Sequence, residues 1–192
     1  MALTLIRHPP VYNPRGLCYG QYEIPLDRNV FADHVSKIKG ELEVRAKEIG
    51  DLPLRVISSP SNRCRILAEK VFTESEITYD SRIKELNFGA WEGQPWDNIS
   101  HKDVTAWSHD FVKQAPPEGE SWIDLAERID VVLSETQEKP EFHWVWLTHG
   151  GPIRTVFCLL SNKDLRDGFN WRVDLGMVCG AENFAHYLQS HQ

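Results

Sequence analysis

A histidine beside an arginine near the start of the chain has the chemistry to hold and attack a phosphoryl group. Arg7 and His8 end a short apolar run, Leu3-Thr4-Leu5-Ile6, and Pro9 and Pro10 follow at once. An imidazole can act as nucleophile or proton shuttle near neutral pH. A guanidinium can grip two phosphate oxygens with parallel hydrogen bonds. Many strands end in Arg-His merely because the strand ends at the protein surface. The pair therefore predicts a phosphoryl site only together with reactive residues from other segments.

Three later segments carry reactive side chains. They are Ser58-Ser59-Pro60-Ser61-Asn62-Arg63, Lys84-Glu85-Leu86-Asn87-Phe88-Gly89-Ala90-Trp91-Glu92-Gly93 and Thr148-His149-Gly150-Gly151-Pro152-Ile153-Arg154. The first and the last follow predicted strands, and the carboxyl ends of parallel strands meet at one edge of a sheet. That edge would hold two histidines and two arginines beside helix N-termini, which favour an anion. Because no His-Glu-x-x-His or His-x-His motif is present, this set predicts a phosphoryl pocket without metal or cofactor.

Strand and helix signals alternate through the first half of the chain. Apolar residues at steps of three and four predict an amphipathic helix between Phe31 and Ile49. Ser59 and Pro60 have the types of an N-cap and a first-turn residue, so we expect a helix to open there. The other predictions are a strand over Ala2–Ile6, a long loop over Pro9–Asn29, and strands over Leu54–Ser58 and Ile77–Tyr79.

The second half begins with an aromatic, irregular stretch from Gly89 to Gly119, in which one short helix is expected around Lys102–Val112. Ser121 and Asp124 have the spacing of a capping box at the start of the next helix. The remaining predictions are a strand over Phe142–Leu147, a helix over Gly150–Leu160, and one or two strands within Trp171–Leu188.

Together these elements predict an α/β fold. Alternating strands and helices favour a mostly parallel central sheet with helices on both faces. At 192 residues, with 41% hydrophobic and 26% charged residues, the chain has the composition of one ordinary globular domain. We therefore expect a single three-layer sandwich over residues 1–192, with a small cap formed by the irregular stretch at 89–119.

The charge balance and the cysteines narrow the classes of function. A formal net charge of −7 argues against nucleic acid as a partner. No apolar run reaches the roughly 20 residues of a membrane helix, and Arg7 interrupts any secretory signal. Four cysteines lie far apart and read as reduced thiols, so a cytoplasmic location is expected. A small anionic substrate is still compatible with this negative charge, because salt screens the charge of distant acidic residues over about 8–10 Å.

The four segments resemble the histidine phosphatase superfamily, with its phosphoglycerate-mutase-like fold, in both order and spacing. The resemblance runs from Ala2 to about Val156. Two further stretches, Cys18-Tyr19-Gly20-Gln21-Tyr22-Glu23-Ile24-Pro25-Leu26 and Pro116-Pro117-Glu118-Gly119-Glu120-Ser121, are similar to the bacterial α-ribazole phosphatases of cobalamin assembly. The resemblance implies a phosphomonoesterase that acts on a small-molecule phosphomonoester, with α-ribazole-5′-phosphate as the expected substrate.

The resemblance also implies a role for each motif residue. His8 would be the nucleophile that carries the phosphoryl group as phosphohistidine. Arg7, Arg63 and His149 would hold the transferring oxygens, and Glu85 would protonate the leaving alkoxide and then activate water. Phosphoryl transfer asks little of a protein beyond positioning and charge neutralisation, which suits this set. We expect the non-attacking N–H of the His8 ring to be held by a carbonyl or a carboxylate.

We expect further substrate contacts from the backbone of two glycines and from one aromatic ring. Gly20 and Gly150 are expected to approach the substrate, and Tyr19 to edge the pocket. One position departs from the family pattern, because Pro9 stands where glycine is common. Proline has no backbone N–H, so a phosphate contact from that amide is impossible.

Several alternatives stay open at this point. Glu92 competes with Glu85 for the acid role, with Glu85 favoured by the family pattern. Arg65 reads as a surface residue. The tryptophans of the cap, Trp91, Trp96 and Trp107, are candidates to stack on a flat heterocycle. A broad sugar or nucleotide phosphatase, a mutase and a non-catalytic phosphate-binding module are the rival functions. The sequence does not decide between a monomer and a homodimer.

Overall fold

A computed structural model of the chain describes residues 1–73 and 75–184. Its centre is a five-stranded sheet with the strand order β3-β2-β4-β1-β5. The strands are β1 (Ala2–Arg7), β2 (Leu54–Ser58), β3 (Ile77–Tyr79), β4 (His143–Thr148) and β5 (Val178–Gly180). Neighbouring strands are parallel except β5, which runs antiparallel to β1 at the edge.

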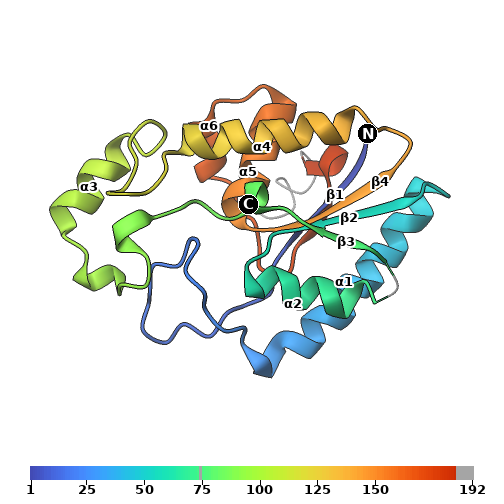
Figure 1. Ribbon diagram of the computed structural model, residues 1–192, viewed down its shortest axis with the longest axis horizontal. Coiled ribbons are helices and arrows are strands. Elements are labelled where there is room, and N and C mark those ends of the chain that lie inside the picture. Colours follow the sequence, from blue (N-terminus) through green and yellow to red (C-terminus); the bar gives the residue numbers. More distant parts are fainter. Residues whose placement is uncertain (74, 185–192) are drawn as a thin grey trace.

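Helices cover both faces of this sheet, as Figure 1 shows. On one face lie α1 (Arg28–Ile49) and α2 (Asn62–Val71), and on the other α4 (Trp122–Gln137), α5 (Gly150–Ser161) and α6 (Leu165–Phe169). The helix α3 (His101–His109) stands apart from the sheet. The predicted α/β sandwich with a mostly parallel sheet is confirmed. Within the described residues, no helix is long and apolar enough to cross a membrane.

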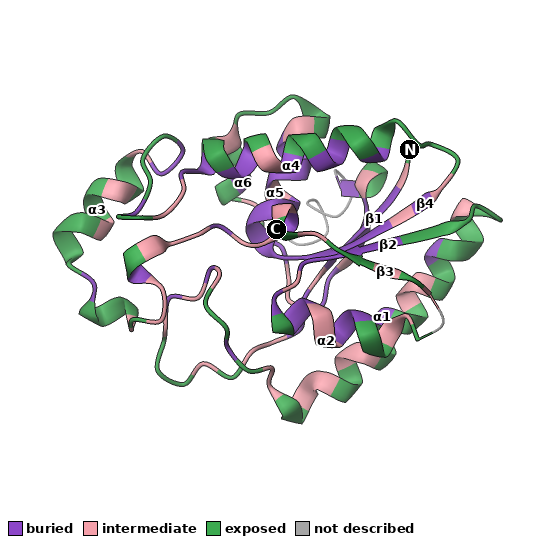
Figure 2. Cartoon of the chain, viewed as in Figure 1, coloured by how far each residue is buried: buried purple, intermediate pink, exposed green. Residues whose placement is uncertain are grey.

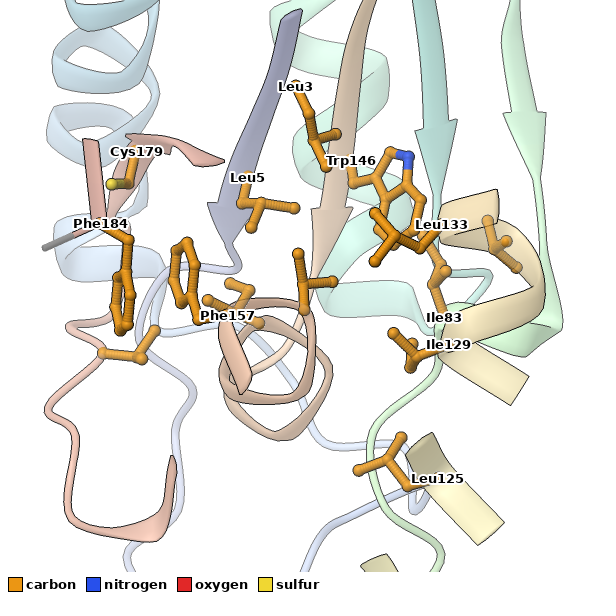
Figure 3. Close-up of a cluster of buried hydrophobic side chains, with 14 of the residues drawn as sticks. Leu3, Leu5, Ile83, Leu125, Ile129, Leu133, Trp146, Phe157, Cys179 and Phe184 are labelled. Atoms are coloured by element: carbon orange, nitrogen blue, oxygen red, sulfur yellow. The ribbon is translucent and has the colours of Figure 1, made fainter. Parts of the chain in front are cut away.

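Two apolar cores lie on the two sides of the sheet, and β1 contributes to both. Its alternating side chains send Leu3 and Leu5 into the core under α4 and α5, and Ile6 into the core under α1 and α2. A strand buried on both faces shows as purple between helices whose outer sides are exposed (Figure 2). Figure 3 shows the larger core, in which the fully buried Trp146 of β4 packs beside Leu133 of α4.

The helix boundaries follow local capping chemistry. The Asp27 side chain accepts a hydrogen bond at the start of α1, and Ser121 and Asp124 form the predicted capping box of α4. The expected start of α2 at Ser59 and Pro60 is wrong, because its N-cap is Ser61. The Ser59 amide instead donates to the Leu147 carbonyl 2.9 Å away, so residue 59 still extends the sheet.

Other differences lie near the ends of elements. The short helix expected to reach Val112 ends at His109 as α3. The tail contributes β5 at Val178–Gly180, and the part of that prediction beyond residue 184 lies outside the described residues. The helix α6 was not expected. Its sequence, Leu-Arg-Asp-Gly-Phe, is too short to show a helical period, although Asp164 caps it.

The stretch from 89 to 119 is built from short helices around a small apolar cluster. Two 3₁₀ helices, Gly89–Trp91 and Trp96–Asn98, precede α3. Buried Cys18, Trp91 and Ile99 form the cluster, so the loop before α1 packs under this stretch. A hydrogen bond of 2.8 Å from the Cys18 amide to the Gln94 carbonyl joins the two segments.

Candidate active site

The carboxyl ends of three parallel strands lie side by side and carry the motif residues. Arg7, the last residue of β1, pairs with Thr148, the last of β4, and Ser58 of β2 pairs with Leu147. The chain then continues into His8, Ser59 and His149, one from each strand. Sheet register alone therefore brings together residues that are far apart in the sequence.

His8 is buried, and its ring has a defined tautomer. Its Nδ1 lies 2.8 Å from the Pro9 carbonyl oxygen. A carbonyl only accepts hydrogen bonds, so Nδ1 carries the proton and Nε2 keeps its lone pair. Burial, then the charges of Arg63 and Arg7, hold the pKa of His8 well below its ordinary value, although the Pro9 bond raises it. The imidazole is thus neutral at pH 7, as a nucleophile must be.

His149 is fully buried next to His8, with 5.2 Å between the ring centroids. Its Nδ1 accepts a hydrogen bond of 3.2 Å from Nε of Arg63, so its Nε2 is the protonated nitrogen. That N–H donates to Oγ of Ser59 over 2.8 Å. Burial and the Arg63 charge are the largest causes that lower the pKa of His149. Two neutral imidazoles therefore share the site.

Arg63 lies near the start of α2 and is almost completely buried. Besides its bond to His149, its guanidinium donates to the Gly20 carbonyl at 2.6 Å and to the Tyr22 carbonyl at 3.3 Å. The ring of Tyr19 lies 5.5 Å from the guanidinium carbon. Arg63 thus ties the loop before α1 to the second histidine, with three of its five N–H groups.

Two more guanidinium groups lie at the start of α5. Nη1 of Arg7 donates to the Val173 carbonyl, and its buried Nε has no hydrogen-bond partner among the described residues. Nε of Arg154 donates to the Trp171 carbonyl at 2.8 Å. A Cβ on Gly150 would lie 2.8 Å from Nη1 of Arg154 and 3.4 Å from Cζ of Arg7. Glycine at 150 therefore lets both arginines approach the same helix end.

Glu85 and Glu92 have different surroundings. The Glu85 carboxylate accepts hydrogen bonds from the Gly151 amide at 3.0 and 3.2 Å, and from the Leu86 amide at 3.0 Å. It therefore lies at the first turn of α5. The Glu92 carboxylate accepts from three other backbone amides, those of Gln21, Tyr22 and Phe88, at 2.7 to 2.9 Å. Glu92 holds the loop before α1 in place.

A cavity of about 260 Å³ opens beside these groups. Its polar lining comes from Arg7, His8, Tyr19, Gly20, Glu85, Gly151 and Arg154. Its apolar lining comes from Leu86, Phe88, Trp96, Trp107, Trp122, Leu125 and Phe169. Glu92 is not among the lining residues, and neither are the deeper Arg63, His149 and Gly150. The cavity thus has a charged end and an aromatic end.

The geometry can support displacement at a phosphorus atom. A neutral imidazole offers one nitrogen lone pair, guanidinium groups neutralise the charge of phosphoryl oxygens, and a carboxylate stands at the side. This arrangement agrees with the roles that the resemblance to the histidine phosphatase superfamily implies. The family model for the histidine phosphatase superfamily (branch 1) matches residues 3–184. The chain belongs to the histidine phosphatase superfamily.

Individual relatives carry several activities. "Putative phosphoserine phosphatase 2" from Hydrogenobacter thermophilus is 26% identical over 90% of this chain and 84% of that protein. "Probable phosphoglycerate mutase GpmB" from Escherichia coli is 30% identical over 73% of this chain and 65%, just under two thirds, of that protein. Among solved structures, the α-ribazole phosphatase from Shigella flexneri has a TM-score of 0.79 at 20% identity, over 93% of this chain and 88% of that one. This last likeness shows the fold.

Some residues of the site gave no signal in the sequence. The segment before β5 holds the two first motif residues, because the Met177 carbonyl accepts from the Arg7 amide and the Gly176 amide donates to the His8 carbonyl, both at 3.1 Å. Phe169 comes from the unexpected α6. Arg154 lies in the His149–Arg154 motif, but nothing in the sequence predicts that it lines the cavity. Arg65, by contrast, pairs with Glu69 on the surface, as expected.

Proposed function

We propose that the protein is a metal-independent phosphomonoesterase with His8 as nucleophile. The observation that carries this proposal is the His8 tautomer. The bond from Nδ1–H to the Pro9 carbonyl leaves an unprotonated Nε2 at the wall of the cavity, between guanidinium groups and a carboxylate. Pro9 lacks the amide of the usual glycine, but its carbonyl supplies the contact that orients the ring.

The reaction would take two displacements. In the first, Nε2 of His8 forms a bond to phosphorus, the bond from phosphorus to the leaving oxygen breaks, and Glu85 gives its proton to that oxygen. In the second, Glu85 takes a proton from water, the water oxygen bonds to phosphorus, and the P–N bond breaks to release inorganic phosphate. Arg7 and Arg63 would neutralise the phosphoryl oxygens in both steps. His149 would stand beside them, positioned by Ser59.

For the substrate, we propose α-ribazole-5′-phosphate, which places the enzyme in cobalamin biosynthesis. This nucleotide carries a flat fused-ring base. The aromatic end of the cavity supports the choice, because rings of Phe88, Trp96, Trp107 and Phe169 line it. The similarity of the Cys18–Leu26 and Pro116–Ser121 stretches to α-ribazole phosphatases supports it as well.

A broad-specificity phosphatase of sugar or nucleotide phosphates is the second candidate. Arg154 favours it, since this residue lines the cavity and adds a cation that a neutral base does not need. The named activities of two relatives, on phosphoserine and phosphoglycerate, point to acidic phosphomonoesters in those proteins.

One assay series tests both the metal-independent mechanism and the choice of substrate. Purified protein is given a panel of phosphomonoesters that includes α-ribazole-5′-phosphate, phosphoserine and nitrophenyl phosphate, with EDTA present throughout. We expect activity in EDTA, none in His8→Ala, and the highest kcat/KM for α-ribazole-5′-phosphate. Activity that is lost to chelation and restored by a divalent metal would refute the metal-independent mechanism. Similar kcat/KM values across the panel would instead favour the broad phosphatase.

Trapping the intermediate tests the nucleophile directly. Rapid quenching without acid, followed by peptide mapping, should find phosphate on His8. The adduct should be labile in acid and stable in base, as a phosphoramidate is. Phosphate found on His149 would reassign the nucleophile.

A further inference from the structure

The backbone on which Glu85 sits is not held by the sheet. Residues 85–88 follow a short 3₁₀ helix, Ser81–Ile83, and belong to no helix or strand. They are nevertheless partly buried, and Leu86 is buried, lining the cavity and packing in the core. Backbone carbonyls in such a segment need hydrogen-bond partners, because a buried carbonyl without one costs about 1–3 kcal/mol. Backbone amides of Glu120 and Trp91 bind the Asn87 and Phe88 carbonyls, at 3.0 and 3.1 Å, and side chains bind the Glu85 carbonyl.

Around Glu85, one side chain, Arg128 of α4, binds three carbonyls. Its Nη1 donates to the carbonyls of Arg82 and Lys84, and its Nη2 donates to the carbonyl of Glu85 at 3.0 Å. Its remaining two N–H groups donate to the Glu120 carboxylate, from Nε at 3.0 Å and from Nη2 at 2.5 Å. A guanidinium has five N–H donors, so Arg128 uses all of them in this cluster.

Two of these contacts lie on either side of Glu85, the residue proposed as general acid. The carbonyls of Lys84 and Glu85 belong to the peptide groups on either side of the Glu85 Cα. Nε2 of Gln21 also donates to the Glu85 carbonyl, at 3.1 Å. Glu120 completes the arrangement, because its carboxylate accepts from the Asn87 amide at 2.8 Å. The position and direction of the Glu85 side chain are thereby fixed from the backbone side.

The far end of Glu85 shows why that direction matters. Its carboxylate reaches the Gly151 amide, and a Cβ at Gly151 would lie only 2.2 Å from Oε1. The approach is so close that a small rotation of the Glu85 backbone would separate the carboxylate from the helix end. Arg128 itself does not line the cavity. Its contacts therefore reach the reacting groups by way of Glu85, and its charge is in addition the smallest of the causes that lower the pKa of His149.

We propose that Arg128 is a positioning residue that holds Glu85 against the first turn of α5 by binding the carbonyls of residues 82, 84 and 85. The catalytic consequence rests on the proposed function, since it needs Glu85 to be the general acid. The structural consequence does not. A lysine cannot replace Arg128, because its three donors on one nitrogen cannot span three carbonyls and a carboxylate.

The first test is structural and needs no substrate. The Gly151 amide signal in ¹H–¹⁵N NMR spectra reports the contact with Glu85, and Glu85→Gln marks the shift expected when that contact changes. We expect Arg128→Met to move this signal by a comparable amount and Arg128→Lys by a smaller one. Arg82→Met is the matched control, since the Arg82 side chain pairs, among the described residues, with the carboxylates of Asp80 on the same segment and Glu135 of α4, and binds none of the three carbonyls. A Gly151 signal that stays in place in both Arg128 variants overturns the inference.

The second test is kinetic. If Arg128 acts through Glu85, Arg128→Met should slow an alkyl phosphate at least about tenfold and nitrophenyl phosphate less than about threefold, because only an alkoxide leaving group needs the proton. The double variant Arg128→Met/Glu85→Gln should be no slower than Glu85→Gln. Equal losses on both substrates, or additive losses in the double variant, would overturn the positioning role. A wild-type protein inactive on every phosphomonoester would refute the proposed function, while the Gly151 signal would still decide on Arg128.

Arg128→Met leaves the Arg82 and Lys84 carbonyls without their donor, removes one of two donors to the Glu85 carbonyl, and can prevent folding. Arg128→Lys keeps the charge and part of the hydrogen bonding, so it carries the same two readouts. In this variant we expect the same substrate pattern with a smaller loss on the alkyl phosphate. Circular dichroism and thermal unfolding of all variants separate misfolding from loss of position.

Discussion

The two ends of the cavity are built by different means. At the phosphoryl end, Arg7 is the last residue of β1, His8 and His149 directly follow parallel strands, and hydrogen bonds hold both rings and the Arg7 guanidinium. At the aromatic end, side chains come from 3₁₀ helices, α3, α4 and the short α6, and they meet mainly by packing of rings. Polar groups in a buried network have few alternative geometries, whereas stacked rings tolerate adjustment. Changes at the first end should therefore affect the chemical step, and changes at the second should affect substrate binding.

The largest effect is expected from the residue that joins the histidine pair to the substrate loop. Arg63→Met removes the bond to His149, the bonds to the Gly20 and Tyr22 carbonyls and a charge near the phosphoryl group. We expect kcat/KM for nitrophenyl phosphate to fall roughly 10²- to 10³-fold, as for other preorganised donors. Arg65→Met, on the same helix but paired with Glu69 on the surface, is the control and should change kcat/KM less than about twofold. A loss below about threefold in Arg63→Met would remove Arg63 from the phosphoryl site.

The two carboxylates separate the chemical step from loop structure. Glu85→Gln should slow substrates with alkoxide leaving groups at least about tenfold more than nitrophenyl phosphate, because general acid catalysis typically supplies roughly 10²- to 10⁴-fold. Glu92→Gln should slow both kinds of substrate equally and lower the melting temperature, since Glu92 binds only backbone amides. Brønsted plots of kcat against leaving-group pKa measure the difference. The reverse pattern would move the acid role to Glu92 and leave the phosphohistidine step intact.

The sequence located the strand-end residues of the phosphoryl end for a physical reason. A strand places its last residue at the sheet edge, so Arg7-His8 and Thr148-His149 could be located from strand signals alone. The register of β1 with β4 then sets their distance. The aromatic end offered no such rule, because α6 has five residues and no helical period. Its Phe169 reaches the cavity only through tertiary packing.

The hydrogen-bond partners of the site residues were the other feature that the sequence did not predict. The need for a carbonyl or a carboxylate at the non-attacking nitrogen of His8 could be stated in advance, but not that the carbonyl of the next residue, Pro9, supplies it at Nδ1. The role of Arg128 was equally invisible. An arginine at that place in α4 looks like a surface residue until the path of residues 82–87 is known. Contacts between a side chain and a distant irregular backbone leave no periodic trace in a sequence.

The depressed pKa values of the two histidines give a prediction with a definite sign. A histidine of ordinary pKa, about 6.5, would be roughly 90% protonated at pH 5.5 and would lose about tenfold in nucleophile concentration. Because burial and the nearby arginines lower the pKa of His8, we expect its ring signals in NMR to titrate below pH 6.5, and at a higher pH in Arg63→Met. Titration at or above 6.5 in the wild-type protein would show that the imidazole is not desolvated as the structure requires.

The same shifts affect stability. Below about pH 6.5 the unfolded chain binds protons at positions 8 and 149, while the folded protein does not until its lower pKa values are reached. The free energy of unfolding should therefore fall on acidification from pH 7 to pH 5.5. Urea titrations at both pH values, with His149→Asn for comparison, measure the contribution of one ring. A smaller fall in the variant supports the neutral, buried state of His149.

The smallest effect is expected at the aromatic end. Phe169 is 56% exposed, lines the cavity and lies 4.8 Å from Phe111 and 6.2 Å from Trp122 between ring centroids. Aromatic pairs contribute roughly 0.5–1.5 kcal/mol, so Phe169→Ala should raise KM for an aromatic phosphomonoester about 2- to 12-fold. The kcat value should stay within about twofold, because the ring contacts of Phe169 are to Phe111 and Trp122 at the aromatic end. Val131→Ala, on the exposed side of α4, is the control for a lost surface side chain.

Two substrates with different leaving groups make the Phe169→Ala result decisive for the comparison between the two ends of the cavity. Naphthyl phosphate and methyl phosphate share the phosphoryl group and differ in what reaches the aromatic end. If the two ends act separately, Phe169→Ala should raise KM for naphthyl phosphate and leave KM for methyl phosphate unchanged. Equal changes for both would mean that Phe169 supports the phosphoryl end through Trp122 and α4 rather than binding the leaving group. No change for either would remove the aromatic wall from substrate recognition, which would weaken the case for a nucleotide with a flat base and strengthen that for a broad phosphatase.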